Sequence, residues 1–410
     1  MLVGSERLGV SRLRCLGGSA VLAGVSQVCS SLGNLLVVVV VSRTSSSAAV
    51  GAVALALLVY QVTVGCVRAL FGEVVLVSGK DPAGDGFARS LLLLSVSVSL
   101  TTVLVSLAVA HMSVTPITVL GLFFVPLLAQ DTLRVLAFAR KRPRDAAVGD
   151  GVWVLMFVGL STYIDIANVE LSASAWFGLW SLCGSVAVLV MAPSQLRLRA
   201  GQWGEWFRTA LPLSRYFLPE YMVGLGTAVL PSLFLVQLAS LSELGQVRLA
   251  AAFFGPIAIA WVALSNIFVP HSRERTLDSL RPEGLMTIGF SLFAVCWLAV
   301  AVLIPERLGS AVFGATWAGA RQWVPWLGLS YVALASSAGA IVGLRVRGRA
   351  ALSLRARAFG VPLAIGGGAV GYLAGGPAGY GIGLVIANSA VAALAWAALI
   401  ARPARDGDPA

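Results

Sequence analysis

The feature that most constrains this chain is a succession of apolar runs of about 20 residues, separated by short polar stretches. A helix of that length crosses the hydrocarbon core of a bilayer. Hydrophobic residues make up 58% of the 410 positions and charged residues only 11%, unlike the composition of a soluble domain. The sequence therefore predicts an all-α polytopic membrane protein.

A spanning window of about 20 residues places about twelve membrane helices, six in each half of the chain. The first half contains the segments 17–41, 47–71, 90–111, 116–138, 149–167 and 171–192. The second half contains the segments 216–239, 247–270, 284–304, 322–344, 358–375 and 379–400. We therefore expect an N-terminal six-helix lobe (1–192), a basic cytoplasmic linker (193–215), a C-terminal six-helix lobe (216–400) and a cytoplasmic tail (401–410).

Basic residues predict how these helices are oriented. Most of the 29 Lys and Arg residues fall on one side of the predicted helices, and the loop 140–144 is the densest run. The loops of the other side hold only Arg43, Arg248, Arg307 and Arg321. Cytoplasmic loops carry the excess of Lys and Arg, so both termini are predicted to be cytoplasmic in a multi-pass protein of the cell membrane. This distribution explains the net charge of +11 without a nucleic-acid partner.

Missing residue types exclude several classes of function. The chain has five scattered cysteines and two histidines, which argues against a metal centre or a disulfide framework. Its only lysines, Lys80 and Lys141, are not part of a phosphate-binding loop, so ATP hydrolysis is not expected. Paired catalytic carboxylates and a large outer loop, as a polysaccharide polymerase requires, are not evident. We expect neither enzymatic activity nor a cofactor.

Polar residues at membrane depth are the candidate functional residues, because such placement is energetically costly. Six of them are predicted near the cytoplasmic ends of helices two, four, seven and eight: Arg68, Gln130, Asp131, Arg134, Glu220 and Asn266. Arg68 and Arg134, with Gln130, could receive a pyrophosphate headgroup, because guanidinium binds phosphate bidentately. The alternative is that Asp131 simply pairs with Arg134 at i,i+3.

Three further features suggest either residues that gate transport or a water-filled cavity inside the protein. Glu220, assigned to the C-terminal lobe, could close a cytoplasmic latch with an arginine of the N-terminal lobe, or remain a surface carboxylate, and Asn266 belongs to the same layer. Amides at the middle of helices one and two either line a cavity or join helices: Gln27, Asn34 and Gln61. Gly255 and Pro256 predict a bend in helix eight, either a hinge or a fixed kink.

Four blocks of the sequence resemble a known family. They are QDTLRVLAFARKRPRDAAVGDGVW, GQVRLAAAFFGPIAIAWVALSNIFVP, FGATWAGARQWVPW and LRVRGRAALSLRARA. These blocks are similar to polysaccharide-biosynthesis membrane proteins, the Wzx-type flippases of the multidrug/oligosaccharidyl-lipid/polysaccharide (MOP) exporter superfamily. The resemblance extends over nearly the whole chain. One departure is that the first helix lacks the arginines that mark the lipid II flippase, which argues against lipid II as substrate.

The resemblance implies a two-lobe translocator that works by alternating access on polyprenyl-pyrophosphate-linked saccharides. It also implies contact with membrane lipids and, as candidate partners, glycosyltransferases or a polysaccharide polymerase. The alternative within the superfamily is an ion-coupled, MATE-like exporter of small amphipathic molecules. A cation exporter requires an acidic residue in its cavity, whereas the layer at Arg68 and Arg134 favours an anionic substrate.

Overall fold

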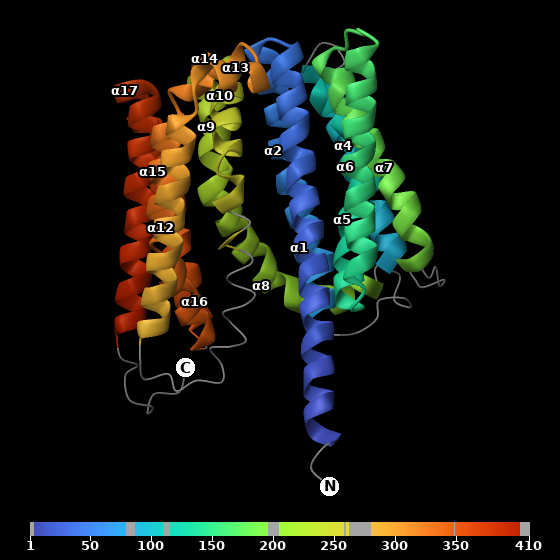
Figure 1. Cartoon of the computed structure of the whole chain (residues 1–410), viewed down its shortest axis with the longest axis vertical. Coiled ribbons are helices and arrows are strands. Elements are labelled where there is room, and N and C mark those ends of the chain that lie inside the picture. The colour runs from blue at the N-terminus through green and yellow to red at the C-terminus, as the bar shows by residue number, and fades with distance from the viewer. Residues whose placement is uncertain are drawn as a thin grey trace. The chain divides into compact units, whose positions relative to one another are not determined.

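The computed structural model describes residues 4–78, 87–109, 115–195, 205–257, 260–261, 280–347 and 349–401. Within these ranges the chain forms helices and no strands (Figure 1). The packing of the chain divides it into two compact units, unit 1 (Met1–Met222) and unit 2 (Val223–Ala410). Nine described helices are long and apolar enough to cross a membrane, one of them long enough for two predicted segments. The predicted all-α polytopic fold is confirmed.

Unit 1 is built from helices that contain most of each predicted segment, although the first of them begins 13 residues before the predicted start at 17 and the helical run that begins at Ser47 continues to Ser78. The helices are α1 (Gly4–Thr44), α2 (Ser47–Val67), the π-helix η1 (Arg68–Gly72), α3 (Glu73–Ser78), α4 (Phe87–Val109), α5 (Pro116–Ala139), α6 (Pro143–Ile166) and α7 (Ala173–Gln195). Helix α5 lies at the centre of unit 1, since it packs against α2, α4, α6 and α7. Its buried face therefore determines what the interior of unit 1 contains.

The helices of unit 2 are interrupted more often than those of unit 1. Its helices are α9 (Leu230–Leu238), α10 (Leu241–Ala252), α12 (Arg281–Leu303), α13 (Glu306–Phe313), α14 (Thr316–Arg321), α15 (Val324–Ala335), α16 (Ala338–Val346) and α17 (Ala350–Ile400). The predicted segment 322–344 is interrupted at Ser336–Ser337, between α15 and α16. Short helices α13 and α14 occupy a region that was predicted as a loop.

Helix α8 (Glu205–Ala228) differs from the prediction at its start. The segment 205–215 was predicted as part of the linker, but it is helical, and the division between the two units falls later, at Met222 and Val223. Residues 196–204 of that linker lie outside the described residues. The loop prediction was wrong from Glu205 onward. A search for uninterrupted apolar segments does not detect a helix in which charged residues such as Arg208 and Arg215 alternate with apolar ones.

Exposed apolar side chains form continuous stripes on the long helices. On α12, Leu285, Ile288 and Leu292 are 61%, 65% and 61% exposed and recur at helical spacing. On α4, Leu100 and Leu104 are likewise exposed. A soluble protein rarely exposes large apolar patches. These stripes are the surfaces that hydrocarbon covers in a membrane.

Helix α17 is a glycine-rich hairpin. Its dihedral angles leave the helical region at Gly375 and at Gly376, whose φ is +56°. The two arms then approach backbone to backbone, because a Cβ on Gly371 would lie 2.0 Å from the carbonyl oxygen of Gly379. Small residues permit such close approach in membranes. The two predicted segments 358–375 and 379–400 therefore correspond to the two arms of this hairpin.

Candidate functional site

Two arginines and two aspartates meet in the interior of unit 1. Asp131 and Arg134 lie in the last third of α5, and Asp150 lies about two turns into α6. Because α6 begins shortly after α5 ends, these positions come to the same level of the two helices. Arg68 reaches the same level from the end of α2. We call Arg68, Asp131, Arg134 and Asp150 the charge network.

Asp131 is the centre of the charge network. Arg68 donates to both of its carboxylate oxygens, with 2.8 Å between Nε and Oδ2 and a shorter contact from Nη2 to Oδ1. Arg134 Nη2 donates to the same Oδ1 at 3.0 Å. The i,i+3 pair that the sequence offered as an alternative is therefore present. The structure adds the bidentate bond from Arg68, which no local spacing could indicate.

Asp150 is the deepest member of the charge network. Its Oδ2 lies 3.7 Å from Arg134 Nη1 and accepts a hydrogen bond from the Ser26 hydroxyl of α1. Its Oδ1 accepts a bond of 2.7 Å from Gln130 Nε2. The amide nitrogen of Gln130, a predicted substrate ligand, is therefore engaged with Asp150. The sequence had placed Asp150 at a helix start, so its role in this network was not foreseen.

The four side chains of the charge network differ in how far they are exposed to solvent. The side chains of Asp131 and Arg134 are each 6% exposed and that of Asp150 is 0% exposed, whereas Arg68 is 30% exposed. Two positive and two negative charges balance in a region where removing one partner of a pair leaves an uncompensated buried charge. A guanidinium also stays charged at low dielectric. An anion from outside unit 1 would thus meet Arg68 first.

The backbone around Arg68 is irregular. Arg68 opens the π-helix η1, and π turns recur at functional sites. One turn earlier, the ring of Tyr221 packs directly on Gly65, where a Cβ would lie 1.5 Å from a ring carbon. Only glycine allows that contact. Tyr221 and the π turn η1 therefore both lie beside Arg68.

An aromatic cluster holds the helices that carry the charge network. Trp153 Nε1 donates to the carbonyl oxygen of Trp180 at 2.8 Å, and Trp180 Nε1 donates to that of Gly33 at 3.0 Å. Tyr60 packs edge-on against Trp180, with 5.6 Å between ring centroids. These contacts tie α1, α2, α6 and α7 together. They fix the level at which Ser26 meets Asp150.

The three predicted mid-helix amides are not brought together by direct hydrogen bonds. Gln27 Nε2 lies 3.5 Å from the Ser31 hydroxyl of its own helix. Asn34 and Gln61 are half-buried, and neither has a hydrogen bond to another described residue. Their role in substrate contact stays a prediction.

Of the two predicted gating residues outside the charge network, the structure describes only Glu220. Glu220 was predicted in the C-terminal lobe, and it falls in unit 1 with Arg68, two residues before the division between the units. It lies near Glu73, a second carboxylate of unit 1. Asn266 lies outside the described residues. The role of Glu220 in a latch stays a prediction.

The predicted bend at Gly255 and Pro256 coincides with an interruption. Helix α10 ends at Ala252, and Phe253 and Phe254 form a turn before Gly255. The amide of Ile257 bonds the carbonyl oxygen of Phe254 rather than an i−4 oxygen. Proline removes one helical hydrogen bond, which accounts for the break. Whether the break moves as a hinge stays a prediction.

Unit 2 contains a buried ion pair that sequence reasoning missed. Arg347, which follows α16, donates through Nη1 to Oε1 of Glu283 in the first turn of α12. The Oε2 atom of Glu283 is buried without a partner among the described residues. Both residues lie at the margins of predicted helices and were treated as loop residues. The sequence offered one indication of this pair, because both helix ends are predicted on the cytoplasmic side of the membrane.

Arg248 is the second residue of unit 2 that the sequence misplaced. It was counted with the outer loops, at the start of the predicted segment 247–270, but it lies well within α10 and is half-buried beside Tyr331. No described carboxylate forms an ion pair with it. An arginine at such depth without an acidic partner is a candidate for binding an anion.

The described residues contain no group of three His, Cys, Asp or Glu side chains that could hold a metal ion. The polar groups that do converge are guanidinium, carboxylate, amide and hydroxyl. Such groups bind a ligand through ion pairs and hydrogen bonds.

Comparisons with known proteins show the fold of the chain. No protein-family model matches the chain, and no curated protein matches it. Among solved structures, lipid II flippase MurJ in an inward closed conformation matches with a TM-score of 0.73 and 11% identity, covering 93% of this chain and 88% of that chain.

Two multidrug transporters are similar to the chain as well. An inward-facing MATE family transporter of the MOP superfamily has a TM-score of 0.70 and 14% identity, over 90% of this chain and 93% of that one. A mutant of the Vibrio cholerae MATE transporter VcmN has a TM-score of 0.64 and 14% identity, over 95% of this chain and 96% of that one. The chain therefore has the fold of MOP superfamily transporters, which is a multi-pass membrane fold.

Proposed function

We propose that this protein translocates a polyprenyl-pyrophosphate-linked oligosaccharide across the cell membrane for cell-surface polysaccharide biosynthesis, by alternating access and without ATP hydrolysis. The observation that carries the proposal is the geometry at Arg68. Its guanidinium binds a carboxylate through two parallel bonds and is 30% exposed. A phosphate presents the same pair of oxygen acceptors as a carboxylate.

The charge network suggests how the headgroup is taken up. Asp131 occupies Arg68 in the resting state, and a pyrophosphate approaching Arg68 replaces it there. Asp131 then keeps its bond to Arg134, so neither aspartate is left without a cation. The exchange avoids the large penalty of an unpaired buried charge. Asp131 is thus a gating residue, and Arg68 is the substrate-binding residue.

The orientation of the protein follows from its basic loops. The loop 140–144 joins α5 to α6 at the end of unit 1 nearest the charge network. By the positive-inside rule this end faces the cytoplasm, as do both termini. Arg68 would then meet the substrate on the side where nucleotide-activated sugars are assembled. Glycosyltransferases or a polysaccharide polymerase are the protein partners that such a substrate suggests.

The membrane potential can supply the driving force. Moving one charge through 100 mV is worth about 2.3 kcal/mol, so two negative charges leaving the cell gain roughly 4 to 5 kcal/mol if they cross the full field. A potassium diffusion potential imposed on vesicles tests this with labelled lipid-linked oligosaccharide. The rate should rise with an interior-negative voltage and fall when its sign is reversed. Indifference to voltage would leave ion exchange as the driver.

The transport proposal is tested with purified protein in vesicles that contain a fluorescent polyprenyl-pyrophosphate-linked oligosaccharide. Wild-type protein should move the label to the other leaflet, where an impermeant quencher reaches it. Arg68→Gln should lower the rate at least tenfold, because it removes the charge-assisted bonds. Arg321→Gln is the matched control, since it breaks an exposed arginine–glutamate pair of unit 2. A wild-type rate equal to that of empty vesicles would overturn the proposal.

A MATE-like, ion-coupled exporter of small amphipathic molecules is the second candidate. The similarity in fold to two MATE transporters favours it. Each buried aspartate of the charge network, however, already faces an arginine. A cation-binding cavity would need an uncompensated carboxylate. Transport of a fluorescent organic cation, driven by a proton or sodium gradient and absent with lipid-linked oligosaccharide, would decide for the exporter.

A further inference from the structure

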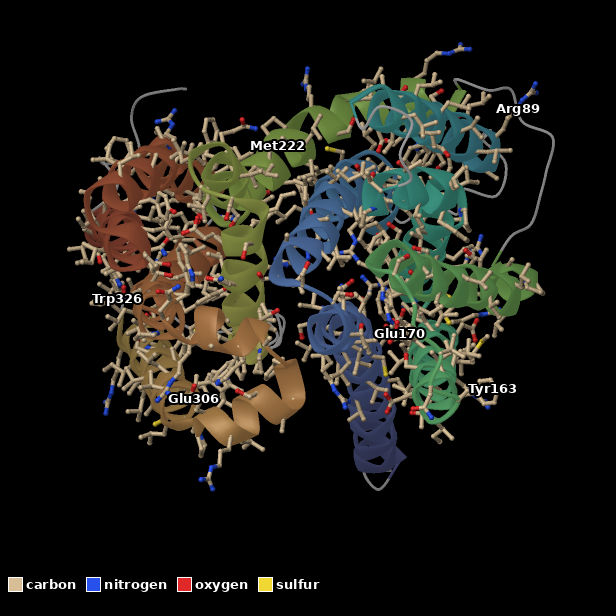
Figure 2. All side chains as sticks on the ribbon, turned by 90° about the horizontal axis from the view of Figure 1, so that it is seen from above. Arg89, Tyr163, Glu170, Met222, Glu306 and Trp326 are labelled. Carbon is tan, nitrogen blue, oxygen red and sulfur yellow. The ribbon has the colours of Figure 1, made fainter. Side chains whose placement is uncertain are left out.

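Two pockets lie at the end of unit 1 where α1 meets α2 and α6 meets α7. One, of about 690 Å³, is lined mostly by polar side chains and loop backbone. The other, of about 310 Å³, is lined largely by apolar side chains of α1 and α6. Figure 2 looks onto this end of unit 1 and shows Glu170 over its interior and Tyr163 at its edge. Pockets of this size suit small molecules.

The two pockets are adjacent and share part of their lining. Both are lined by Thr44, Asp165 and Trp176. The polar pocket adds Ser45, Asn168, Glu170 and Ser172. The apolar pocket adds Leu36, Val39, Val40, Phe157 and Val158. A ligand that fills both must have a hydroxyl-rich part joined to a hydrocarbon part.

Two donor groups mark the junction, the exposed guanidinium of Arg43 and the buried indole of Trp176. Arg43 lines the apolar pocket beside Thr44, and no described carboxylate forms an ion pair with it. Trp176 is buried, and its indole Nε1 has no hydrogen-bond partner among the described residues. Buried donors are nearly always paired in native structures. The Trp176 indole therefore calls for an acceptor from a ligand, and the Arg43 guanidinium beside the same pocket is a second donor for acceptor oxygens between the polar and apolar parts of that ligand.

We propose that these pockets form a second, outer binding site for the lipid-linked saccharide, with the sugar in the polar pocket, phosphate at Arg43 and the first isoprene units along α1 and α6. This inference rests on the proposed function. Carboxylates, amides and hydroxyls are the groups that bind sugar hydroxyls, and a guanidinium binds phosphate. The apolar side chains of the second pocket cover the hydrocarbon.

The position of this site fits a receiving role. Ser26, which contacts the charge network, and Arg43 are both on α1 and lie roughly 25 Å apart along its axis at 1.5 Å per residue. That separation approaches the thickness of the hydrocarbon core, about 30 Å. One cationic site therefore lies near each membrane surface. The outer site holds the substrate after it has crossed and before it diffuses into the outer leaflet.

Photolabelling tests the site directly. The probe is a polyprenyl-pyrophosphate-linked disaccharide with a diazirine on its second isoprene unit, added to full-length protein in nanodiscs. We expect label on peptides covering 36–44 or 157–165. Unlabelled lipid-linked disaccharide should displace it at least tenfold better than polyprenyl pyrophosphate or phosphatidylglycerol. Equal displacement by phosphatidylglycerol would mean an ordinary lipid-headgroup site and would overturn the inference.

Variants sharpen the result. Arg43→Gln should lower labelling about tenfold, and Trp176→Phe, which keeps the ring but removes the donor, about threefold to tenfold. Glu170→Gln is an exposed substitution that keeps the test open if Trp176→Phe fails to fold. Arg307→Gln, an exposed arginine of unit 2, is the matched control and should leave labelling unchanged. Unchanged labelling in all three site variants would also contradict the inference.

The translocation assay on the same preparations separates the two proposals. Wild-type protein that translocates the lipid but carries no label at 36–44 or 157–165 would overturn the outer site and leave the function standing. Wild-type protein that neither translocates nor becomes labelled would overturn both.

Discussion

Unit 1 and unit 2 stabilise their interiors in different ways. In unit 1, four charged side chains from α2, α5 and α6 form one network, and Asp131 alone binds two arginines. In unit 2, one buried pair joins Glu283 to Arg347, and the longest helical element is held by contacts between glycines. A network connects several helices at one level, whereas glycine contacts join two helix arms along their length. The units should therefore respond differently to single substitutions.

The largest effect is expected at the centre of the unit 1 network. Asp131→Ala leaves two guanidinium groups without their shared carboxylate and should lower the free energy of unfolding by about 3 to 5 kcal/mol. Urea or guanidinium unfolding in detergent micelles measures it. Asp131→Ala combined with Arg134→Ala should recover part of the loss. If the double variant is no more stable than the single one, the two side chains are not coupled.

A smaller loss is expected where glycine contacts hold unit 2. Gly371→Ala places a methyl group 2.0 Å from the carbonyl oxygen of Gly379, so the hairpin must separate, at about 1 to 3 kcal/mol. A Cβ added to Gly366 would meet no atom within 4 Å, which makes Gly366→Ala the matched control. This control should leave the thermal unfolding midpoint unchanged or raise it slightly. Equal losses in the two variants would show that close backbone packing is not the cause.

A still smaller change is expected from the buried pair of unit 2. Glu283→Gln keeps the shape of the side chain and removes one charge-assisted bond, a loss of about 1 to 2 kcal/mol. Arg347 is 12% exposed, so water can partly replace the carboxylate. The measurement is the same unfolding experiment, with transport assayed alongside. A loss as large as that of Asp131→Ala would remove the contrast between the units.

The smallest effect is expected at the surface. Arg321 and Glu306 form a pair of 3.3 Å in which the side chains are 50% and 64% exposed. Exposed pairs contribute little, so Arg321→Gln should change stability by no more than about 0.5 kcal/mol. Chemical unfolding of this variant gives the baseline for the other three. A clearly larger loss would mean that α13 and α14 depend on the pair.

Much of the fold could be predicted from the apolar runs. Nearly every predicted segment begins or ends within a few residues of a helix, because burial in hydrocarbon demands uninterrupted helices. The breaks could not be predicted equally well. Ser336–Ser337 interrupts a run that is apolar on both sides, and nothing local distinguishes these serines from helical ones.

The site was predictable only where its members are neighbours in sequence. Asp131 and Arg134 lie three residues apart, so their pairing follows from helical geometry. Arg68 lies 63 positions from Asp131, and that contact depends on how α2 packs against α5. The predicted lobe boundary lies at the longest polar stretch, whereas the compact units divide at Met222, so that Glu220 falls in unit 1.

The charge network also has a consequence for how the protein is made. An Asp or Arg in a spanning helix disfavours insertion, by up to about 2.5 to 3.5 kcal/mol at the helix centre and by less toward its ends, so α5, which carries Asp131 and Arg134, is a poor candidate to enter the bilayer alone. Its charges are neutralised by Arg68 of the preceding part of the chain and Asp150 of the following helix. Stable integration of α5 would therefore wait for α6 to emerge from the ribosome, with α2 already in place. The four residues of the charge network would thus also set the order in which these helices assemble at the translocon.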